Sequence, residues 1–328
     1  MKNVFTVSIL FLLFFSCKKE ADNIKINGPI FGTFYDVTYA SKNSENYQKQ
    51  FDSIFYIINK SMSNYQANSD ISKLNRHEID SVDNHFVKVF NASKKLYTET
   101  EGVFDPTIGK LVNAWDFGSE KPKDKLDSLK IDSLKRYVGF NKIGLVGNRV
   151  RKPYGAFIDF NAIAKGYAVD VIGDFLESKT IENYMVNIGG ELRAKGVNVK
   201  KQTGWTVGIE NPNFDGSQST NMVFKLKDKA MATSGTYRKF KIDNKGNRYA
   251  HIIDTKTGYP SKTNILSVSV IADNCMIADG YATAIQAMGI EKAKSLLETH
   301  PELQAYLIFE NERQELKTLN LNNFSVGN

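Results

Sequence analysis

The chain has 328 residues, of which 41% are hydrophobic and 24% are charged. These fractions are typical of a globular protein with a sizeable core, and they exclude a largely disordered chain and a multi-pass membrane protein. Lysine and arginine number 43 against 36 aspartate and glutamate residues, which gives a formal charge of +7. No run of like charges concentrates this excess, so it gives weak support for an anionic ligand and less for nucleic acid.

The N-terminus predicts an exported protein. Lys2 precedes an apolar stretch at 4–15 that is too short to span a bilayer as a helix and is typical of a signal peptide. The sequence around Cys17 resembles a bacterial lipobox, although Leu13 lies one place further from the cysteine than the usual leucine. An ordinary secretory signal with an incidental cysteine is the alternative.

These features predict a domain organisation. A signal peptide at 1–16 would be followed by a lipid-anchored tether at 17–28, on the periplasmic side of a bacterial membrane. Residues 29–328 would then form one large domain or two closely packed halves. With Cys17 acylated, Cys275 has no intrachain partner, and we expect it to be buried as a small apolar residue.

The first half of the chain indicates helices joined by shaped loops. The segment 32–39 alternates like a half-buried strand, and helical spacing follows over 51–60 and 82–101. Closely spaced glycines and an Asp-Pro pair predict a shaped loop over 102–118, and the charged segment 119–136 predicts a surface excursion with some helix.

From Arg151 onward, short strands with tight turns dominate the sequence. They include a hairpin through 243–246, and two helices interrupt them at about 161–178 and 274–288. The pattern predicts an α+β fold with mainly antiparallel sheets and packed helices, and not a doubly wound parallel sheet.

The stretch DFNAIAKGYAVD, residues 159–170, has more polar and small residues than a structural helix start requires. A helix start offers unpaired N–H groups and a positive dipole end to phosphate, and Lys165 would add a formal charge. The small Ala162 would let a ligand or metal approach the backbone. These residues alone support a ligand site and a capped structural helix equally.

Asp279 and Thr283 stand four residues apart and so share a helix face otherwise made of small residues. A carboxylate and a hydroxyl are hard oxygen ligands of the type that Mg²⁺ prefers, with water and substrate phosphates completing the shell. Taken alone, an aspartate that accepts from neighbouring backbone is the better-supported alternative.

A third group surrounds the segment from Ser234 to Asp254 and includes Arg238 and His251. A histidine base beside arginine and serine donors would suit proton transfer near a phosphate. A structural histidine in a strand is the alternative.

These blocks occur together and in this order in the FAD:protein FMN transferases of the ApbE type, which the chain resembles from Gly32 to Met288. The blocks are GTFYDVTY, MSNYQANSDISKLN, GVFDPTIGKLVNAWDFG, IDFNAIAKGYAVD, NIGGELRAKG, WTVGIENP, ATSGTYRKF, HIIDTKTGYP and ADGYATA. The resemblance implies a single ApbE-like, T-fold-related catalytic unit that uses Mg²⁺. It would pass FMN from FAD, through a phosphoester bond, to a Thr or Ser hydroxyl of an exported target flavoprotein, with release of AMP.

The resemblance also implies roles for individual residues. The metal ligands fall on Asp279, Thr283 and the backbone carbonyl of Ala162, and the catalytic base falls on His251. Cofactor contacts fall on Tyr65, Ala114, Trp115, Asp116, Phe117, Asp159, Lys165, Ser234, Arg238 and Ile253. Asp116 stands where the family commonly has glycine.

Two rival activities remain open. FAD hydrolysis to FMN and AMP would need only water in place of the target hydroxyl, and the tyrosine at position 65 favours transfer. A non-catalytic FAD-binding lipoprotein would need neither His251 nor Asp279. By resemblance, the expected targets are exported subunits of ion-translocating electron-transfer complexes.

Overall fold

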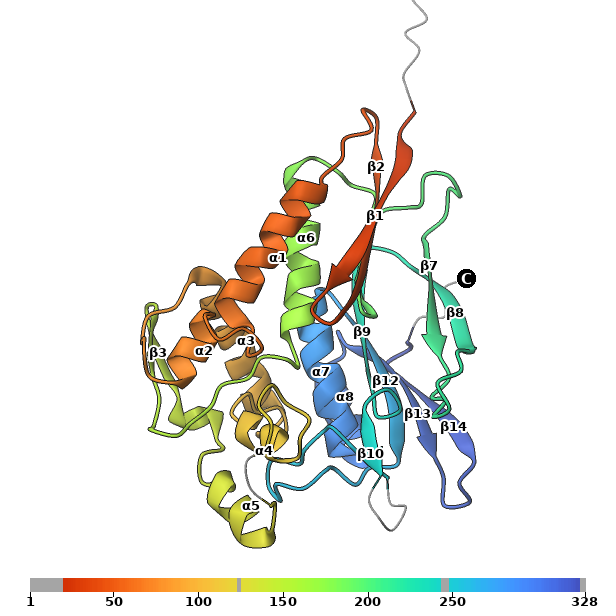
Figure 1. Cartoon of the computed structure of the whole chain (residues 1–328). Helices are drawn as coiled ribbons and strands as arrows, with labels where there is room; N and C mark the ends of the chain where they lie inside the picture. The colour runs from red at the N-terminus through yellow and green to blue at the C-terminus, as the bar shows by residue number, and fades with distance from the viewer. Residues whose placement is uncertain (1–19, 123–124, 243–247, 325–328) are drawn as a thin grey trace, which may run out of the picture.

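The computed structural model describes residues 20–122, 125–242 and 248–324 (Figure 1). An eight-stranded sheet lies at its centre, and every neighbouring pair of its strands runs antiparallel. In sheet order the strands are β1 (Asp22–Ile30), β2 (Thr33–Ser41), β5 (Tyr184–Ile188), β6 (Glu191–Lys195), β9 (Lys229–Gly235), β12 (Ile265–Ala272), β13 (Gln304–Glu310) and β14 (Leu316–Leu321).

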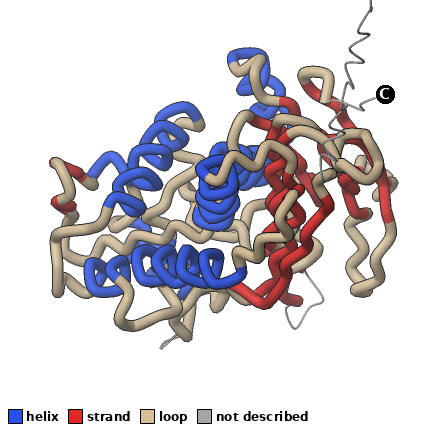
Figure 2. Tube along the Cα trace, turned by 90° about the horizontal axis from the view of Figure 1, so that it is seen from above, coloured by secondary structure: helices blue, strands red, loops and turns tan. Residues whose placement is uncertain are grey.

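The helices gather on one side of this sheet, as the view from above shows (Figure 2). They are α1 (Gln48–Met62), α2 (Asp70–Asn75), α3 (Asn84–Glu99), α4 (Gly109–Ala114), α5 (Ser128–Lys135), α6 (Ala164–Ser178), α7 (Cys275–Met288) and α8 (Ile290–Thr299), with a 3₁₀ turn at Phe140–Lys142. Helix α6 packs on β5 and β6, and α7 packs on β9 and β12. The main hydrophobic core lies between these helices and the sheet.

A second, smaller core covers the opposite face. The hairpin of β7 (Trp205–Glu210) and β8 (Thr220–Leu226) packs its apolar side against outward residues of the sheet, including Leu192, Met231 and Ile308. Strand β12 is therefore covered on both faces, and all of its residues are buried. This two-sided burial explains why its sequence, ILSVSVIA, has no long-chain polar residue.

Two further strand pairs stand apart from the sheet. These are β3 (Gly144–Val146) with β4 (Arg149–Arg151), and β10 (Phe240–Ile242) with β11 (Arg248–Ala250). The latter pair flanks the predicted hairpin turn at 243–246, which lies outside the described residues.

The α+β, mainly antiparallel fold predicted from the sequence is confirmed, and Cys275 is buried as expected. The predicted tether is wrong in its second half, because residues from Asp22 onward form β1 and pair with β2. Helix α8 was not predicted; Gly289, at φ 82, ends α7 and begins α8 without an intervening loop. The signal peptide and Cys17 lie outside the described residues.

Of the helices in the described ranges, none combines the length and the apolar character that crossing a bilayer requires.

Candidate active site

A cavity of about 330 Å³ opens where α6, α7, the β5–β6 turn, β9 and the loop at 103–117 come together. It brings together most of the residues predicted from the sequence. Those that line it are Tyr65, Phe117, Asp159, Ala162, Lys165, Ser234, Arg238, His251, Ile253, Asp279 and Thr283.

The N-terminal turns of α6 and α7 meet at one wall of the cavity. The backbone N–H of Gly166 donates to Oδ2 of Asp279 at 3.0 Å. A Cβ atom on Gly166 would lie 2.4 Å from the carbonyl oxygen of Cys275, so only glycine permits this approach. Glycine 166 therefore fixes the carboxylate of Asp279 at the cavity wall.

This contact limits one expectation. One of the two interpretations of the sequence was that the start of α6 offers its unpaired N–H groups to phosphate. The N–H of Ala164 instead donates to the carbonyl of Phe160 at 2.8 Å, and that of Gly166 to Asp279. Lys165 remains as the group of this turn that can face an anion in the cavity.

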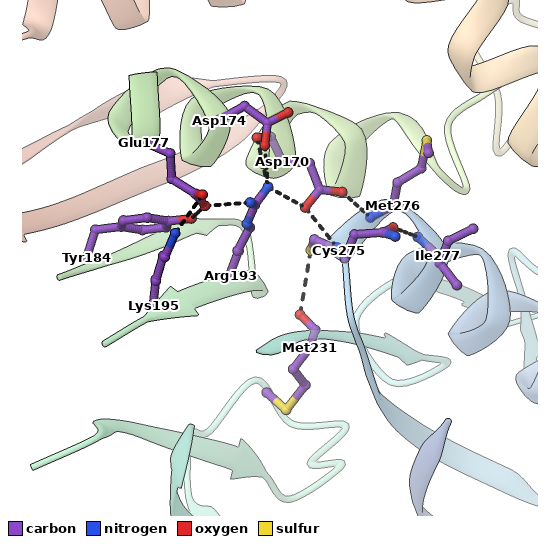
Figure 3. Close-up of polar contacts among 11 residues, drawn as sticks. Asp170, Asp174, Glu177, Tyr184, Arg193, Lys195, Met231, Cys275, Met276 and Ile277 are labelled. Atoms are coloured by element: carbon purple, nitrogen blue, oxygen red, sulfur yellow. Dashed lines mark hydrogen bonds and ion pairs between the residues drawn. The ribbon is translucent and has the colours of Figure 1, made fainter. Parts of the chain in front are cut away.

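A buried network anchors the start of α7 to α6 and β6 (Figure 3). The two carboxylate oxygens of Asp170 accept from the N–H groups of Cys275 at 2.9 Å and Met276 at 2.8 Å, which caps the helix together with Asn274. Arg193 of β6 lies 3.5 Å from Asp170 and pairs with Asp174 at 2.8 Å. The helix that presents Asp279 and Thr283 is thus tied to two other elements.

The wall near Asp279 is strongly charged. The ammonium of Lys165 lies 2.6 Å from Oε1 of Glu191, which is 2% exposed. Burial, and then the charge of Glu191, raise the pKa of Asp279 to about 8. Burial by itself lowers the pKa of Lys165, but the carboxylates of Glu191 and Asp279 outweigh it and raise that pKa above its ordinary value. Additional positive charge at this wall would favour the ionised form of Asp279.

His251 lies on another wall. Its Nδ1 is 3.1 Å from the carbonyl oxygen of Lys239, and since a carbonyl can only accept, Nδ1 carries the proton in the neutral ring. Burial, with help from the cations of Lys239 and Lys165, lowers the pKa of His251 to about 4. At neutral pH the imidazole is therefore neutral, with Nε2 able to accept a proton.

Two asparagines of the MSNYQANSDISKLN block hold the backbone next to Asp159. The side chain of Asn75 holds both backbone groups of Ile158, accepting from its N–H at 2.8 Å and donating to its carbonyl at 2.8 Å. Asn64 donates to the same carbonyl at 3.3 Å. Burial raises the pKa of Asp159 above its ordinary value, while the N–H of Asn161 donates to its Oδ1 at 2.8 Å.

Three predicted cofactor contacts do not line the cavity: Ala114, Trp115 and Asp116. The indole of Trp115 donates to the carbonyl of Gly258 at 2.9 Å and packs against Tyr249 and Tyr259. Asp116 has a φ of 59, in the left-handed region that glycine favours, and its carboxylate is 2.5 Å from Lys241. Trp115 and Asp116 are linked to Phe117, which does line the cavity: Tyr249 packs against the rings of Trp115 and Phe117, and Lys241 lies over the Phe117 ring.

Several residues of the lining were not predicted from the sequence, including Glu191, Thr233 and Lys239. One local feature of the sequence could have drawn attention to Glu191: a charged residue directly after two glycines. The structure shows it to be buried, and a fully buried glutamate is rare unless it is paired. Lys239 donates to the carbonyl of Phe117 at 2.5 Å, a contact between segments 122 residues apart, and the sequence holds no sign of it.

In the described parts of the chain, no group of three or more His, Cys, Asp or Glu side chains could hold a metal ion. The predicted ligand set is of another kind, one carboxylate with a hydroxyl and a carbonyl. Asp279, Thr283 and Ala162 line the same cavity, and Oε2 of Glu191, also in its lining, is buried without a hydrogen-bond partner. Hard oxygen ligands and an unsatisfied carboxylate oxygen fit a Mg²⁺ ion that keeps several waters.

Comparison with known proteins decides the family. A model described as the ApbE family matches residues 31–307. The chain belongs to the ApbE family. Among curated members, the FAD:protein FMN transferase of Vibrio cholerae is 35% identical over 92% of this chain and 92% of its own length. That of Haemophilus influenzae is 35% identical over 89% of this chain and 88% of its own length.

Solved structures of ApbE proteins share the fold. The flavin transferase ApbE from Vibrio cholerae has a TM-score of 0.83 at 32% identity, over 93% of this chain and 98% of that one. The apo form of the Pseudomonas stutzeri flavinyl transferase ApbE has a TM-score of 0.81 at 27% identity, over 92% of this chain and 95% of that one. The resemblance inferred from the ordered sequence blocks is therefore confirmed.

Proposed function

We propose that this ApbE protein is an FAD:protein FMN transferase. A Thr or Ser hydroxyl of a target protein attacks the phosphorus on the FMN side of the FAD pyrophosphate. A new phosphoester bond forms to the target oxygen, the bond to the bridging oxygen breaks, and AMP leaves with that oxygen. The hydroxyl proton goes to a base of the enzyme.

The observation that carries this proposal is the convergence of a neutral histidine, a lysine and an oxygen-ligand set on one cavity. Phosphoryl transfer depends mainly on positioning and on neutralising charge, so these groups supply what the reaction needs. Lys165 faces the phosphates, and Nε2 of His251 accepts the proton of the attacking hydroxyl.

Asp279, Thr283 and the carbonyl of Ala162 would hold the cation. A bound Mg²⁺ would neutralise charge on the pyrophosphate as the bond to AMP breaks. The tie between Gly166 and Asp279 keeps the carboxylate in place, and the network at the start of α7 keeps the helix in place.

FAD itself occupies the cavity as the substrate. Asp159 and Tyr65 belong to the same lining as Lys165, and Phe117, Ile253, Ser234 and Arg238 complete the surface available to the flavin nucleotide. Ala114, Trp115 and Asp116 act behind Phe117 and have no direct contact in this proposal.

The proposal extends to the location of the enzyme. The N-terminal sequence supports export, lipidation at Cys17 and anchoring to a bacterial membrane facing the periplasm. The targets would then be exported flavoproteins, such as subunits of ion-translocating electron-transfer complexes. Labelling of cells with a radioactive or clickable fatty acid, compared between the native protein and Cys17→Ala, tests the anchor.

One experiment tests the transfer reaction. Protein lacking residues 1–17 is incubated with FAD, Mg²⁺ and an exported flavoprotein domain with an acceptor Thr, and a denaturing gel is scanned for flavin fluorescence. A fluorescent target band that disappears with chelator, and with Asp279→Ala or His251→Ala, is the expected result. Free FMN and AMP without a band would favour hydrolysis, and intact bound FAD would favour storage.

A further inference from the structure

Glu191 lies at a tight turn that aims it into the cavity. The two residues before it, Gly189 and Gly190, have φ values of 65 and 108, which side chains rarely adopt. Oδ1 of Asn187 accepts from the N–H of Gly190 at 2.9 Å and closes the turn. Glu191 then begins β6 as a buried carboxylate in the cavity lining.

The two carboxylate oxygens of Glu191 have different surroundings. Oε1 accepts from the ammonium of Lys165 at 2.6 Å. Oε2 is buried and has no hydrogen-bond partner. A buried acceptor left without a donor is costly, so such an atom on a residue that lines a cavity indicates a donor supplied by what the cavity binds.

The position of Glu191 restricts the nature of that donor. Lys165 binds Glu191 through its ammonium group, and the next residue in the chain, Gly166, binds Asp279 through its backbone N–H. Glu191 therefore lies at the end of the cavity where Asp279 would hold a cation. A phosphate group of FAD is an acceptor and an anion, so it would repel Oε2 instead of satisfying it.

We propose that Oε2 of Glu191 accepts a hydrogen bond from a water molecule on the divalent cation held by Asp279, which makes Glu191 an additional member of the cation site. Mg²⁺ keeps several waters in protein sites, and carboxylates that bind those waters orient the ion without touching it. The inference deepens the proposed function and rests on its cation site.

A purely structural role for Glu191, holding Lys165 in place, makes a different prediction. If that were its only role, the cation would respond only to the charge of Glu191, and Glu191→Asp, which keeps the charge but shortens the side chain, would bind Mg²⁺ like the native protein. In our proposal Glu191→Asp also weakens Mg²⁺ binding, because its carboxylate is withdrawn from the cation-bound water. Removing the charge of Glu191 weakens cation binding, whereas removing the charge of Lys165 leaves the carboxylates with less competing positive charge.

The test measures Mg²⁺ affinity by isothermal titration calorimetry on the full chain without FAD. Glu191→Gln, which keeps the shape of the side chain, should weaken Mg²⁺ binding by about tenfold or more. Lys165→Met should bind Mg²⁺ as tightly as the native protein or more tightly. Glu177→Gln is the matched control, because Glu177 is ion-paired with Arg193 and Lys195 at 2.7 Å each but does not line the cavity (Figure 3).

Native Mg²⁺ affinity in Glu191→Gln or in Glu191→Asp would overturn the inference. So would a variant whose FAD affinity falls while its Mg²⁺ affinity is unchanged. Asp279→Ala distinguishes a failure of the proposed cation site from a failure of the role given to Glu191. If it also binds Mg²⁺ like the native protein, the cation site of the proposed function is wrong. If it alone loses Mg²⁺, only the role of Glu191 is wrong.

Discussion

The N–H of Gly166 donates to the carboxylate of Asp279 across 113 residues of sequence. This one bond joins the first turn of α6 to the fifth residue of α7 and holds Asp279 next to the residue that follows Lys165. A side chain at position 166 would meet the backbone of Cys275 at 2.4 Å and Cβ of Asp279 at 2.8 Å.

Gly166→Ala should therefore push the two helices apart. We expect the free energy of unfolding to fall by about 1–3 kcal/mol, as for other overpacked cores. Flavin transfer should fall far more than stability, because Asp279 moves away from Ala162 and Lys165. Urea unfolding and the gel assay measure the two effects. Gly144→Ala is the control, since its Cβ would meet nothing closer than 3.9 Å; equal transfer by both variants would contradict the argument.

Asp170 offers a prediction about stability. Asp170→Ala removes the acceptor for two N–H groups of α7 and a partner of Arg193 in a buried setting. We expect a loss of about 3–5 kcal/mol, the usual effect of removing one partner from a buried charged network. Asp174 pairs with the same arginine, but its side chain is 68% exposed. Asp174→Ala should lose at most about 1 kcal/mol, and similar losses in the two variants would show that burial of Asp170 is not decisive.

Part of the site could be predicted because its signals are local. Asp279 and Thr283 share a helix face by their spacing alone, and the structure places both in the cavity. The two polar residues of β12, Ser267 and Ser269, are short, as expected in a strand that is covered on both faces. By contrast, β1 is an edge strand with many exposed positions, so its sequence reads like a polar tether.

The rest depends on contacts between distant segments. Glu191 meets Lys165 only because β6 packs beside α6, and nothing near either residue in the sequence indicates the pair. Trp115 and Asp116 belong to a block whose other members, among them Phe104, Val112 and Phe117, do line the cavity. Their own side chains bind Gly258 and Lys241 instead, and these partners lie more than a hundred residues away in the sequence.

His251 yields a prediction on pH. The neutral ring is the form that accepts a proton, and it is present above a pKa of about 4. As pH falls from 8 to 5, kcat/KM for flavin transfer should show no loss due to His251, and an acid limb should follow near pH 4. Lys239→Met removes a cation that lowers this pKa, so the limb should move to higher pH. The native acid limb could instead lie near the ordinary histidine pKa of about 6.5 and stay there in Lys239→Met. That result would contradict the claim that burial and Lys239 lower the pKa of His251.

The side chain of His251 should matter for rate and not for binding. His251→Ala should lower flavin transfer by about 10²–10⁴-fold, the usual contribution of a positioned base. Because the ring is one of many groups in the lining, FAD affinity measured by fluorescence quenching should stay close to native. A variant that binds FAD poorly, or that turns over normally, would contradict a role as the base.

Tyr65 bears on the balance between transfer and hydrolysis. Its ring lines the cavity and is 62% exposed, so it stands between the bound nucleotide and solvent. Tyr65→Asn should open the cavity to water and raise FMN and AMP release without a target, measured by chromatography. Tyr154→Asn is the control, because Tyr154 is 88% exposed and stacks on His77 away from the lining. If both variants release FMN at the native rate, Tyr65 does not exclude water, and the choice of acceptor must depend on how the target hydroxyl is held near His251.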